Sequence, residues 1–535
     1  MKKTLLSLFT LIALTLVAAC SSEGTQSNTP SEEGAEGGGD GGTLIIGIES
    51  EADVLDPHRA GGWVTFRINR QIHESLVTGD LSDPNAMYPP IKPGLAESWD
   101  ISEDGLTYTF HLREGVKFHD GTDFNAEAVE FNVRRAWDPS FEYYDAKSAG
   151  NLSLVYERVK DIRVEDEYTF VFEFDEPFSA FLSLLTQGGM GSTGILSPTA
   201  LMEVGNDQYA ENPVGTGPFK FESRERGQRI ELVRNEDYWG EKPKLSGVIF
   251  RPIPDGSARV LALESGEVDI IAVPTPDSVE RLVDSGFKLE QSAPPHSWYL
   301  NFNFDHPAIS DLRVRQAIIM AIDREGMAKD LLRGTATPST SAQAPANSAY
   351  DPDFIDYEYN PEKAKELLEE AGYGDGFDVT FQTSIDGSGQ LIPVPMAEWI
   401  QADLAKVGIN VTLDTYEWIT YLGFWTTMEP EVGFNQMSWG MSTPYFLSII
   451  GTENGIGNAG NYYNPEFDEL VEKAITEVDP DEADEYWKQA NQILADDAAF
   501  APIVNDTAPY LMADYVEGFV APNEEWYDLI DVTIN

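Results

Sequence analysis

Alternating apolar and polar residues over the stretch 95–132 predict a small β–β–α unit. Leu106, Tyr108 and Phe110 alternate with threonines, which is the period-two pattern of a strand with one buried face. Residues with turn chemistry, namely Asp, Glu and Gly, stand on both sides of this strand. Asn125 precedes a helical run, so we expect its side chain to cap the N-terminus of a helix.

The same two periodicities recur along the first half of the chain. Residues 43–48 (TLIIGI) predict a first strand, and residues 67–76 predict a helix. The alternating run 164–174 (VEDEYTFVFEF) predicts one strand, which a helix over 178–185 follows. At residues 261–271 a helix ends at a glycine and a strand begins, as in a βα-type repeat.

The second half of the chain shows the same alternation of helices and strands. Residues 298–303 predict an extended segment, and residues 311–322 predict a helix with one apolar face. Asn360 is expected to open a further helix, and residues 397–407 predict another, followed by a strand at 411–413.

The first twenty residues have the pattern of a bacterial lipoprotein signal peptide. A short basic start precedes the apolar residues 5–18, which are too few for a comfortable membrane span. Small residues then precede Cys20, the only cysteine in the chain. We therefore interpret residues 1–20 as a lipoprotein signal peptide and Cys20 as the lipid anchor. The alternative is an ordinary secretory signal with a chance cysteine.

Residues 21–42 contain Ser, Gly, Glu and other polar residues and almost nothing apolar. Such a segment cannot bury enough surface to offset its ordering entropy, so we expect a disordered acidic Gly/Ser tether. The rest of the chain, about 490 of the 535 residues, is long enough for two or three lobes. It contains no further apolar run of membrane-spanning length.

Acidic residues outnumber basic residues by 91 to 35, which gives a formal net charge of −56. This charge argues against nucleic acid as a partner, because phosphate binding needs a basic surface. The acidic residues are scattered, so we interpret most of them as a solvated surface. An acidic surface of this kind suggests a saline or alkaline habitat.

No catalytic or metal-binding motif stands out in the sequence. A single cysteine excludes an intrachain disulfide and leaves no cysteine cluster for zinc. The six histidines form no His-Glu-x-x-His pair, and no Gly-x-Ser-x-Gly segment is present. We therefore expect no enzyme, no cofactor and no metal, although a catalytic pair among so many carboxylates remains open.

The run SEDGLTYTFHLREGVKFHDGTDFNAEAVEFN, within the stretch 95–132, closely resembles the signature region of the peptide/nickel-type solute-binding proteins. These proteins are the extracellular receptors of ABC importers, with oligopeptide- and dipeptide-binding lipoproteins as well-known members. Further blocks with family-like spelling are NPVGTGPFK at 212–220 and NEDYW at 235–239. The resemblance covers nearly all of residues 43–520.

This resemblance implies a two-lobed α/β fold of the periplasmic-binding-protein type II, with mixed central sheets and an additional β-rich accessory domain. The expected crossings between the lobes lie near residues 291–298 and 500–505, which permits hinge closure over a ligand. The expected domains are lobe I over 43–79, 181–294 and 500–535, the accessory domain over 80–180, and lobe II over 295–499.

The resemblance also implies a ligand cleft between the lobes that is rich in aromatic residues. The residues expected there are Gly61, Gly62, Trp63, Trp298, Trp418, Trp439, Gly440, Met441 and Ser442. Core packing is the alternative for each tryptophan, and for Trp425 we prefer it.

One departure from the family pattern bears on the ligand. Peptide-binding members place an Asp shortly after the tryptophan that Trp439 matches, where it pairs with the ligand's ammonium group. Here Ser442 falls near that position, so the usual peptide anchor is missing. Glu417 and Glu429 are candidate replacements, although each is also explained as a solvated surface residue.

The implied function is capture of a small solute outside the cell and its delivery to the permease and ATPase subunits of an ABC transporter. An oligopeptide is the leading ligand, and an oligosaccharide, which would stack on tryptophan faces, is the alternative. A nickel chelate is less favoured because no histidine–carboxylate cluster stands out. A cell-surface hydrolase and an adhesive surface lipoprotein are the alternatives from other classes. We expect a monomer that is attached to the membrane through its lipid only and faces the extracellular or periplasmic space.

Overall fold

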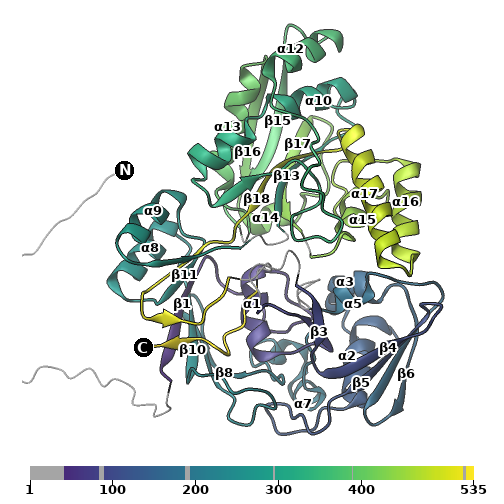
Figure 1. Cartoon of the computed structure of the whole chain (residues 1–535), viewed down its shortest axis with the longest axis vertical. Coiled ribbons are helices and arrows are strands. Elements are labelled where there is room, and N and C mark those ends of the chain that lie inside the picture. The colour runs from purple at the N-terminus through teal and green to yellow at the C-terminus, as the bar shows by residue number, and fades with distance from the viewer. Residues whose placement is uncertain are drawn as a thin grey trace, which may run out of the picture. The chain divides into compact units, whose positions relative to one another are not determined.

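The computed structural model describes residues 41–82, 89–186, 193–292, 296–387, 389–440, 442–521 and 526–535. The predicted signal peptide with Cys20 and most of the predicted tether lie outside these described residues. No helix in the described ranges is both long enough and apolar enough to cross a membrane. The elements form two lobes, each built on a large mixed sheet, and a smaller sheet beside the first lobe (Figure 1).

The first lobe contains a seven-stranded sheet in the order β12-β19-β11-β1-β10-β9-β8. Strand β1 is parallel to both β10 and β11, so these three strands end at the same edge of the sheet. The predicted first strand over 43–48 is confirmed as β1. The strand bounds are β1 Thr43–Ile48, β8 Phe219–Glu225, β9 Arg229–Arg234, β10 Gly247–Pro252, β11 Ile270–Ala272, β12 Lys288–Glu290 and β19 Tyr510–Met512.

Helix α1 (Trp63–Ile72) packs on this sheet through Val64, Ile68 and Ile72, which lie four residues apart on one face. It begins four residues before the predicted range 67–76 and ends before His73, whose backbone is extended. The other helices of this lobe are α7 Pro198–Tyr209, α8 Gly256–Ser265 and α9 Pro276–Asp284. Two short hairpins complete it, β2 Val77–Gly79 with β3 Ile91–Pro93, and β20 Val516–Glu517 with β21 Thr533–Ile534.

The accessory unit is a four-stranded antiparallel sheet in the order β4-β5-β7-β6. The predicted alternation is confirmed, since Tyr108 and Phe110 of β5 are buried, and so is the predicted cap, since Asn125 accepts a hydrogen bond from the Ala128 amide at 3.0 Å. The single strand predicted over 164–174 is wrong, because a turn divides it into β6 and β7. The bounds are β4 Ala96–Ile101, β5 Thr107–Leu112, β6 Val159–Asp166, β7 Thr169–Phe174, α2 Ala126–Trp137, α3 Ala146–Asn151, α4 Ser153–Tyr156 and α5 Phe181–Leu185.

The second lobe contains a six-stranded sheet in the order β14-β18-β13-β17-β15-β16. Strand β15 is parallel to β16 and β17, whereas β13 is antiparallel to both of its neighbours. The strands are β13 Ser297–Phe302, β14 Ala336–Pro338, β15 Phe377–Ser384, β16 Ile409–Tyr416, β17 Val432–Trp439 and β18 Phe500–Asp506. The helices are α10 Leu312–Ala321, α11 Arg324–Gly326, the π-helix Met327–Leu331, α12 Pro361–Glu370, α13 Pro393–Ala405, α14 Trp418–Leu422, α15 Phe446–Gly451, α16 Pro465–Thr476 and α17 Pro480–Asp496.

The chain crosses between the two sheets twice. It leaves the first sheet after β12 and enters the second at β13, and it returns between β18 and β19. The return was expected at 500–505, but those residues lie inside β18, which pairs with β13 and β14. The second crossing therefore falls between Asp506 and Tyr510.

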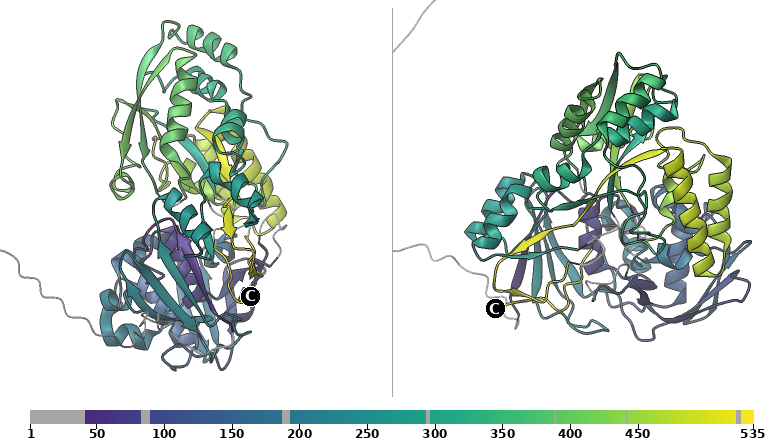
Figure 2. Two further views of the ribbon diagram at one scale, coloured as in Figure 1. Left: turned by 90° about the vertical axis from the view of Figure 1, so that its left-hand side faces the viewer. Right: turned by 45° about the horizontal axis from the view of Figure 1, so that its top comes forward.

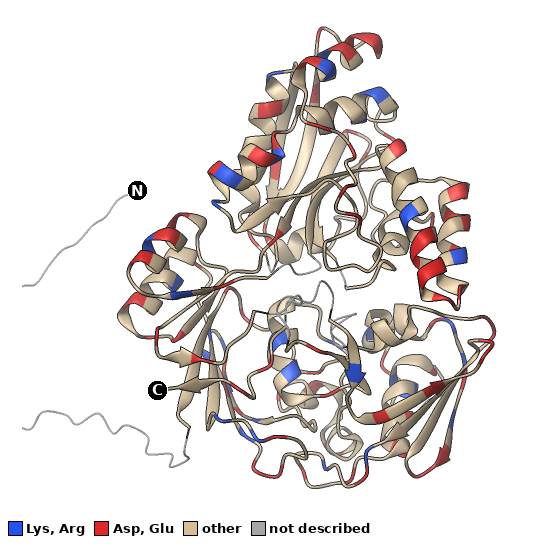
Figure 3. Cartoon of the chain, viewed as in Figure 1, with Lys and Arg blue, Asp and Glu red and all other residues tan. Residues whose placement is uncertain are grey.

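The accessory unit contacts helix α16 of the second lobe. The Ser179 amide donates a hydrogen bond to the Ile475 carbonyl at 2.9 Å, and Arg158 forms two hydrogen bonds with Glu472, at 3.0 and 2.7 Å. The views in Figure 1 and Figure 2 agree in placing α16 and α17 next to this unit. Figure 3 shows Asp and Glu distributed over the helices of both lobes.

Candidate functional site

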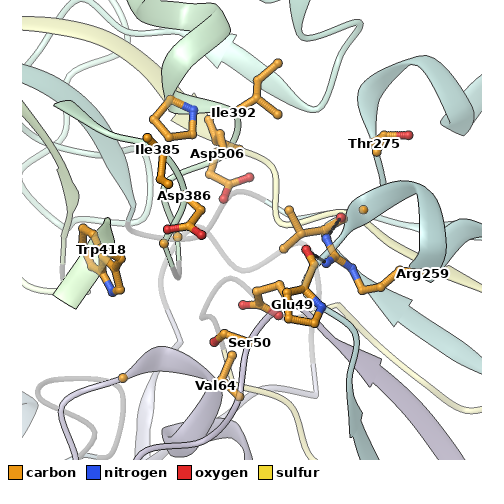
Figure 4. A pocket seen from close by; sticks show the side chains of 18 of the residues that line it. Glu49, Ser50, Val64, Arg259, Thr275, Ile385, Asp386, Ile392, Trp418 and Asp506 are labelled. Carbon is orange, nitrogen blue, oxygen red and sulfur yellow. Dashed lines mark hydrogen bonds between the residues drawn. The ribbon is translucent and has the colours of Figure 1, made fainter. Parts of the chain in front are cut away.

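A cavity of about 650 Å³ lies between the two lobes. Its walls come from the segments that follow β1, β10 and β11 in the first sheet and β15 and β16 in the second. Asp506 and Pro509, at the return crossing, also line it (Figure 4). The cavity therefore lies outside the carboxyl ends of parallel strands, which is where ligands bind in open α/β sheets.

Two arginines, Arg67 and Arg259, fix the position of residues in the first-lobe wall of the cavity. Arg67 Nη1 donates hydrogen bonds to both carboxylate oxygens of Glu49, at 2.8 and 2.9 Å. Burial alone raises the pKa of Glu49, but the positive charges of Arg67 and Arg259 outweigh it and leave the pKa lowered. Arg259 donates four hydrogen bonds, to the carbonyls of residues 253, 254, 272 and 273, at 2.7 to 3.2 Å. Its guanidinium thus fixes the loops that follow β10 and β11.

The glycines predicted to approach the ligand line this same wall. Asp53 organises their loop, because its carboxylate accepts hydrogen bonds from the Gly61 amide at 2.9 Å and from Thr65 Oγ1 at 2.5 Å. Gly61 and Gly62 are both among the lining residues, as are Asp53 and Thr65.

Trp418 lines the opposite wall at the first residue of α14. The Glu417 carboxylate caps this helix by accepting a hydrogen bond from the Thr420 amide at 3.2 Å. A Cβ added to Gly387, which has φ of +137°, would lie 2.6 Å from Cδ2 of Trp418, so the loop after β15 packs against the indole. The apolar residues Ile385, Leu391 and Ile392 extend this wall.

The lining is acidic. It contains six carboxylates and a single basic residue, Arg259, among the residues that the structure describes. Glu49 pairs with Arg67, and Glu51 pairs with Arg224 at 2.6 Å. The other carboxylates are Asp53, Asp386, Glu417 and Asp506.

Two of the predicted cleft tryptophans pack elsewhere. Trp63 stacks on Trp526 with ring centroids 5.0 Å apart and meets the edge of His296 at 4.9 Å. Trp298 is fully buried in the core of the second lobe, because all six residues of β13 are covered on both faces of the sheet. Neither is among the residues that line the cavity.

The segment after β17 is not part of the described cavity wall. Trp439 is half-buried against Trp425 and Phe446, with ring centroids 6.1 and 6.0 Å away. Gly440 and Ser442 do not line the cavity, and Met441 lies outside the described residues. Of the two candidate replacement acids, Glu417 lines the cavity and Glu429 does not. Trp425 is 8% exposed and belongs to the hydrophobic core, where we expected it.

Sequence reasoning missed Asp386, Asp506 and Arg259. No local pattern marks them. Asp386 lies two residues beyond β15, Asp506 is the last residue of β18, and Arg259 lies in the first turn of α8, the helix that follows β10. For Asp386 and Arg259 the signal that could have found them is topological, because residues that follow parallel strands collect at one edge of a sheet. Strand β18 is antiparallel to both of its neighbours, so this signal does not apply to Asp506.

The lining offers little for catalysis. It contains hydroxyls and carboxylates but, over the described residues, no His, Cys, Lys or Tyr. No group of His, Cys, Asp and Glu in the described ranges is arranged to hold a metal ion. Three histidines, His58, His73 and His296, are buried instead, and burial lowers the pKa of His58 to about 4 and that of His73 to about 3.

A family model matches residues 90–458, and its description is bacterial extracellular solute-binding proteins, family 5. This chain belongs to that family. It is 33% identical over 451 residues to heme-binding protein A of Haemophilus influenzae, which covers 80% of this chain and 82% of the relative. It is 32% identical over 463 residues to the dipeptide-binding protein of Escherichia coli, which covers 80% and 83%.

A solved structure of a periplasmic binding protein has the same fold as this family 5 protein. The structure is an ABC transporter-associated periplasmic binding protein of Helicobacter pylori in complex with the peptide STSA. It is 30% identical, superimposes with a TM-score of 0.80, and covers 92% of this chain and 98% of its own. The predicted family and the predicted two-lobed type II α/β fold are both confirmed.

Proposed function

We propose that this protein captures a small solute, with peptides as the leading class, in the cavity between its lobes and delivers it to the permease and ATPase of an ABC importer. The observation that carries the proposal is the lining of the cavity, which comes from both lobes and from the return crossing. Two crossing segments at one hinge permit the lobes to close as rigid bodies over a ligand.

Size and relatives favour a peptide. A volume of about 650 Å³ lies within the usual range for small-molecule sites, roughly 300 to 1,000 Å³. The relatives include a dipeptide-binding protein and a protein solved with a tetrapeptide. Haem fits less well, because the described lining residues include no His, Met, Cys or Tyr to hold the iron. An oligosaccharide is less supported, since Trp418 is the single aromatic residue among the described lining residues.

Binding without turnover is part of the proposal. A hydrolase needs a nucleophile and a base within hydrogen-bond reach, or two carboxyls placed across the scissile bond. The described lining has no histidine or lysine for the first arrangement, and two of its six carboxylates are held by arginines. We therefore propose a binding protein that needs no cofactor.

The membrane attachment, location and macromolecular partners of the protein are also part of the proposal. Cys20, after cleavage of the signal peptide, would carry the lipid that holds the chain at the membrane, with residues 21–42 as a tether. The protein would act as a monomer on the extracellular or periplasmic side. Its macromolecular partners would be the permease and ATPase, and the net charge of −56 leaves no role for nucleic acid.

Equilibrium dialysis of the full chain against a tripeptide mixture, with mass spectrometry of the retained peptides, tests the proposal. We expect retention in the micromolar range or tighter. Trp418→Ala removes an apolar wall of the cavity and should weaken retention at least tenfold. Trp99→Ala, in the accessory sheet, is the matched control and should leave retention unchanged. Retention of no peptide by a folded protein would refute the peptide assignment.

A further inference from the structure

The accessory unit is held to the first lobe. The buried ion pair between Arg135 and Asp56, at 2.5 Å, joins helix α2 to the loop after β1, and the His119 amide donates a hydrogen bond to the Gly215 carbonyl at 2.9 Å. The chain connects this body to the second lobe through the two crossing segments. A contact between the accessory unit and the second lobe is therefore a contact between two bodies that a hinge at the crossings would separate.

The last turn of α16 in the second lobe is capped from the accessory unit. The last carbonyls of a helix have no partners within the helix, so they need donors from elsewhere. The Ser179 amide donates a hydrogen bond to the Ile475 carbonyl at 2.9 Å. The Ser179 hydroxyl lies 3.0 Å from the carbonyl oxygens of both Ala474 and Ile475 and can donate to either. One residue after β7 thus supplies two donors to a helix of the other lobe.

An ion pair adds to this contact one turn earlier on α16. Arg158, which directly precedes β6, donates two hydrogen bonds to the Glu472 carboxylate, at 3.0 and 2.7 Å. Such a two-bond geometry fixes the orientation of both side chains as well as their distance. The Arg158 guanidinium also lies over the ring of Phe178, 5.7 Å from its centroid. Glu472 and Ile475 are three residues apart, so the accessory unit contacts one face of the helix.

Apolar packing continues through the same contact. Phe178 is 0% exposed, and its ring centroid lies 5.8 Å from that of Tyr445, which directly precedes α15. Both belong to one cluster of buried apolar residues, which includes residues of the accessory sheet and of α15, α16 and α17. A Cβ added to Gly105 would lie 3.2 Å from Cγ2 of Val478, so the turn before β5 touches the segment after α16. Separating the two bodies would expose these apolar surfaces to water, which is unfavourable.

The contact lies away from both the cavity and the crossings. The described residues that line the cavity do not include Arg158, Phe178, Ser179, Tyr445 or Glu472. Figure 1 shows α16 and the accessory unit on the right, whereas α9, which precedes the first crossing, lies on the left. A contact that forms in one relative position of two bodies stabilises that position, whatever occupies the space between them.

We propose that this contact is a latch that stabilises the closed arrangement of the lobes. Part of the free energy that retains a ligand then comes from residues that do not touch the ligand. The inference rests on the proposed function, because the closed arrangement is the one that encloses the solute. The latch holds part of the unliganded population closed, and the ligand completes the shift. Breaking the latch lowers the closed fraction, so the apparent affinity for every ligand falls by the same factor.

Charge reversal in α16 tests the latch. Glu472→Arg places two guanidinium groups against each other, whereas the double variant Arg158→Glu with Glu472→Arg restores an ion pair with its charges exchanged. We expect Glu472→Arg to weaken the dialysis retention of every tripeptide that the full chain retains by the same factor, at least threefold, and we expect the double variant to recover it. Glu469→Arg is the matched control and should leave retention unchanged, because Glu469 pairs with Lys473 of its own helix at 2.7 Å.

Small-angle X-ray scattering of the unliganded chain gives a second measurement that needs no peptide. The radius of gyration of Glu472→Arg should exceed that of the unmodified chain and of Glu469→Arg, and the double variant should return to the unmodified value. An unchanged radius of gyration in Glu472→Arg would overturn the latch and leave the peptide function standing. A loss of retention that the double variant does not recover would overturn the assignment to the Arg158 pair. If the unmodified chain retained no tripeptide, the peptide function would fall, and the scattering comparison would still decide the latch.

Discussion

Arg135 holds a fully buried ion pair that joins the accessory helix α2 to the loop after β1. Its Nη2 lies 2.5 Å from Asp56 Oδ2, and both side chains are 0% exposed. Its Nη1 also donates to Nδ1 of His58 at 3.0 Å, while Nε2 of His58 donates to the Gly194 carbonyl at 3.0 Å. Asn206 Oδ1 accepts from the same guanidinium at 2.9 Å. Arg135→Met would roughly keep the volume and remove the charge and the hydrogen bonds that the guanidinium donates to Asp56, His58 and Asn206.

The expected loss of stability comes from the Asp56 carboxylate, which stays buried after its ion-pair partner is removed. Without Arg135, the buried Asp56 carboxylate loses its ion-pair partner and keeps only the longer-range attraction of Arg59, which costs about 3–5 kcal/mol. The double variant Arg135→Met with Asp56→Asn removes the stranded charge and should regain part of that loss. The neighbouring Arg134 pairs with Asp138 at 2.8 Å near the surface, so Arg134→Met should cost about 1 kcal/mol or less.

Urea unfolding followed by both circular dichroism and tryptophan fluorescence measures these differences. Two probes are needed because a chain with several lobes can unfold in more than one step. The effect of Arg135→Met should appear in the transition that includes the first lobe and the accessory unit. A loss below 1 kcal/mol, equal to that of Arg134→Met, would refute the view that the buried pair ties these parts together.

Three further predictions follow. Lowering the pH from 6.5 toward 4.5 should reduce the free energy of unfolding by up to about 1.4 kcal/mol per pH unit for each histidine whose pKa burial lowers, because the unfolded chain binds protons that the folded chain rejects. A urea midpoint that is higher at pH 4.5 than at pH 6.5 would contradict this prediction. The histidines whose pKa burial lowers to about 3 or 4 are His58, His73, His119 and His296. Gly387→Ala should displace the Trp418 ring and weaken peptide binding severalfold in calorimetry, and unchanged affinity would show that the loop adapts. Cys20→Ala should release the protein from membranes on fractionation, and continued membrane association of the variant would refute lipid anchoring through Cys20.

Local patterns predicted the elements that local interactions determine. The buried face of β5 and the Asn125 cap depend on residues within a few positions of each other, so they could be read from the sequence. The hairpin between β6 and β7 could not, because its turn contains no Gly or Pro and the alternation continues on both sides. The second crossing was placed too early because it depends on the pairing of β18 with β13, about two hundred residues away in sequence.

The residues of the candidate site were also predicted from the sequence only in part. Gly61, Gly62 and Trp418 lie beside strand ends, where the family resemblance and the sheet topology agree. Trp298 lies within a strand, and whether a strand side chain faces a cavity or a core depends on the layers that cover its sheet. Asp386 has no sequence signal of its own, because its place in the cavity lining arises from the parallel register of β15 and β16.

Lobe closure on a ligand tests the central claim most directly. Small-angle X-ray scattering of the full chain, with and without a saturating tripeptide that the dialysis retains, gives the radius of gyration of both states. If the cavity between the lobes is the binding site and both crossings act as one hinge, the radius of gyration should fall on binding. An unchanged radius of gyration at saturation, with calorimetry showing the peptide bound, would contradict the account.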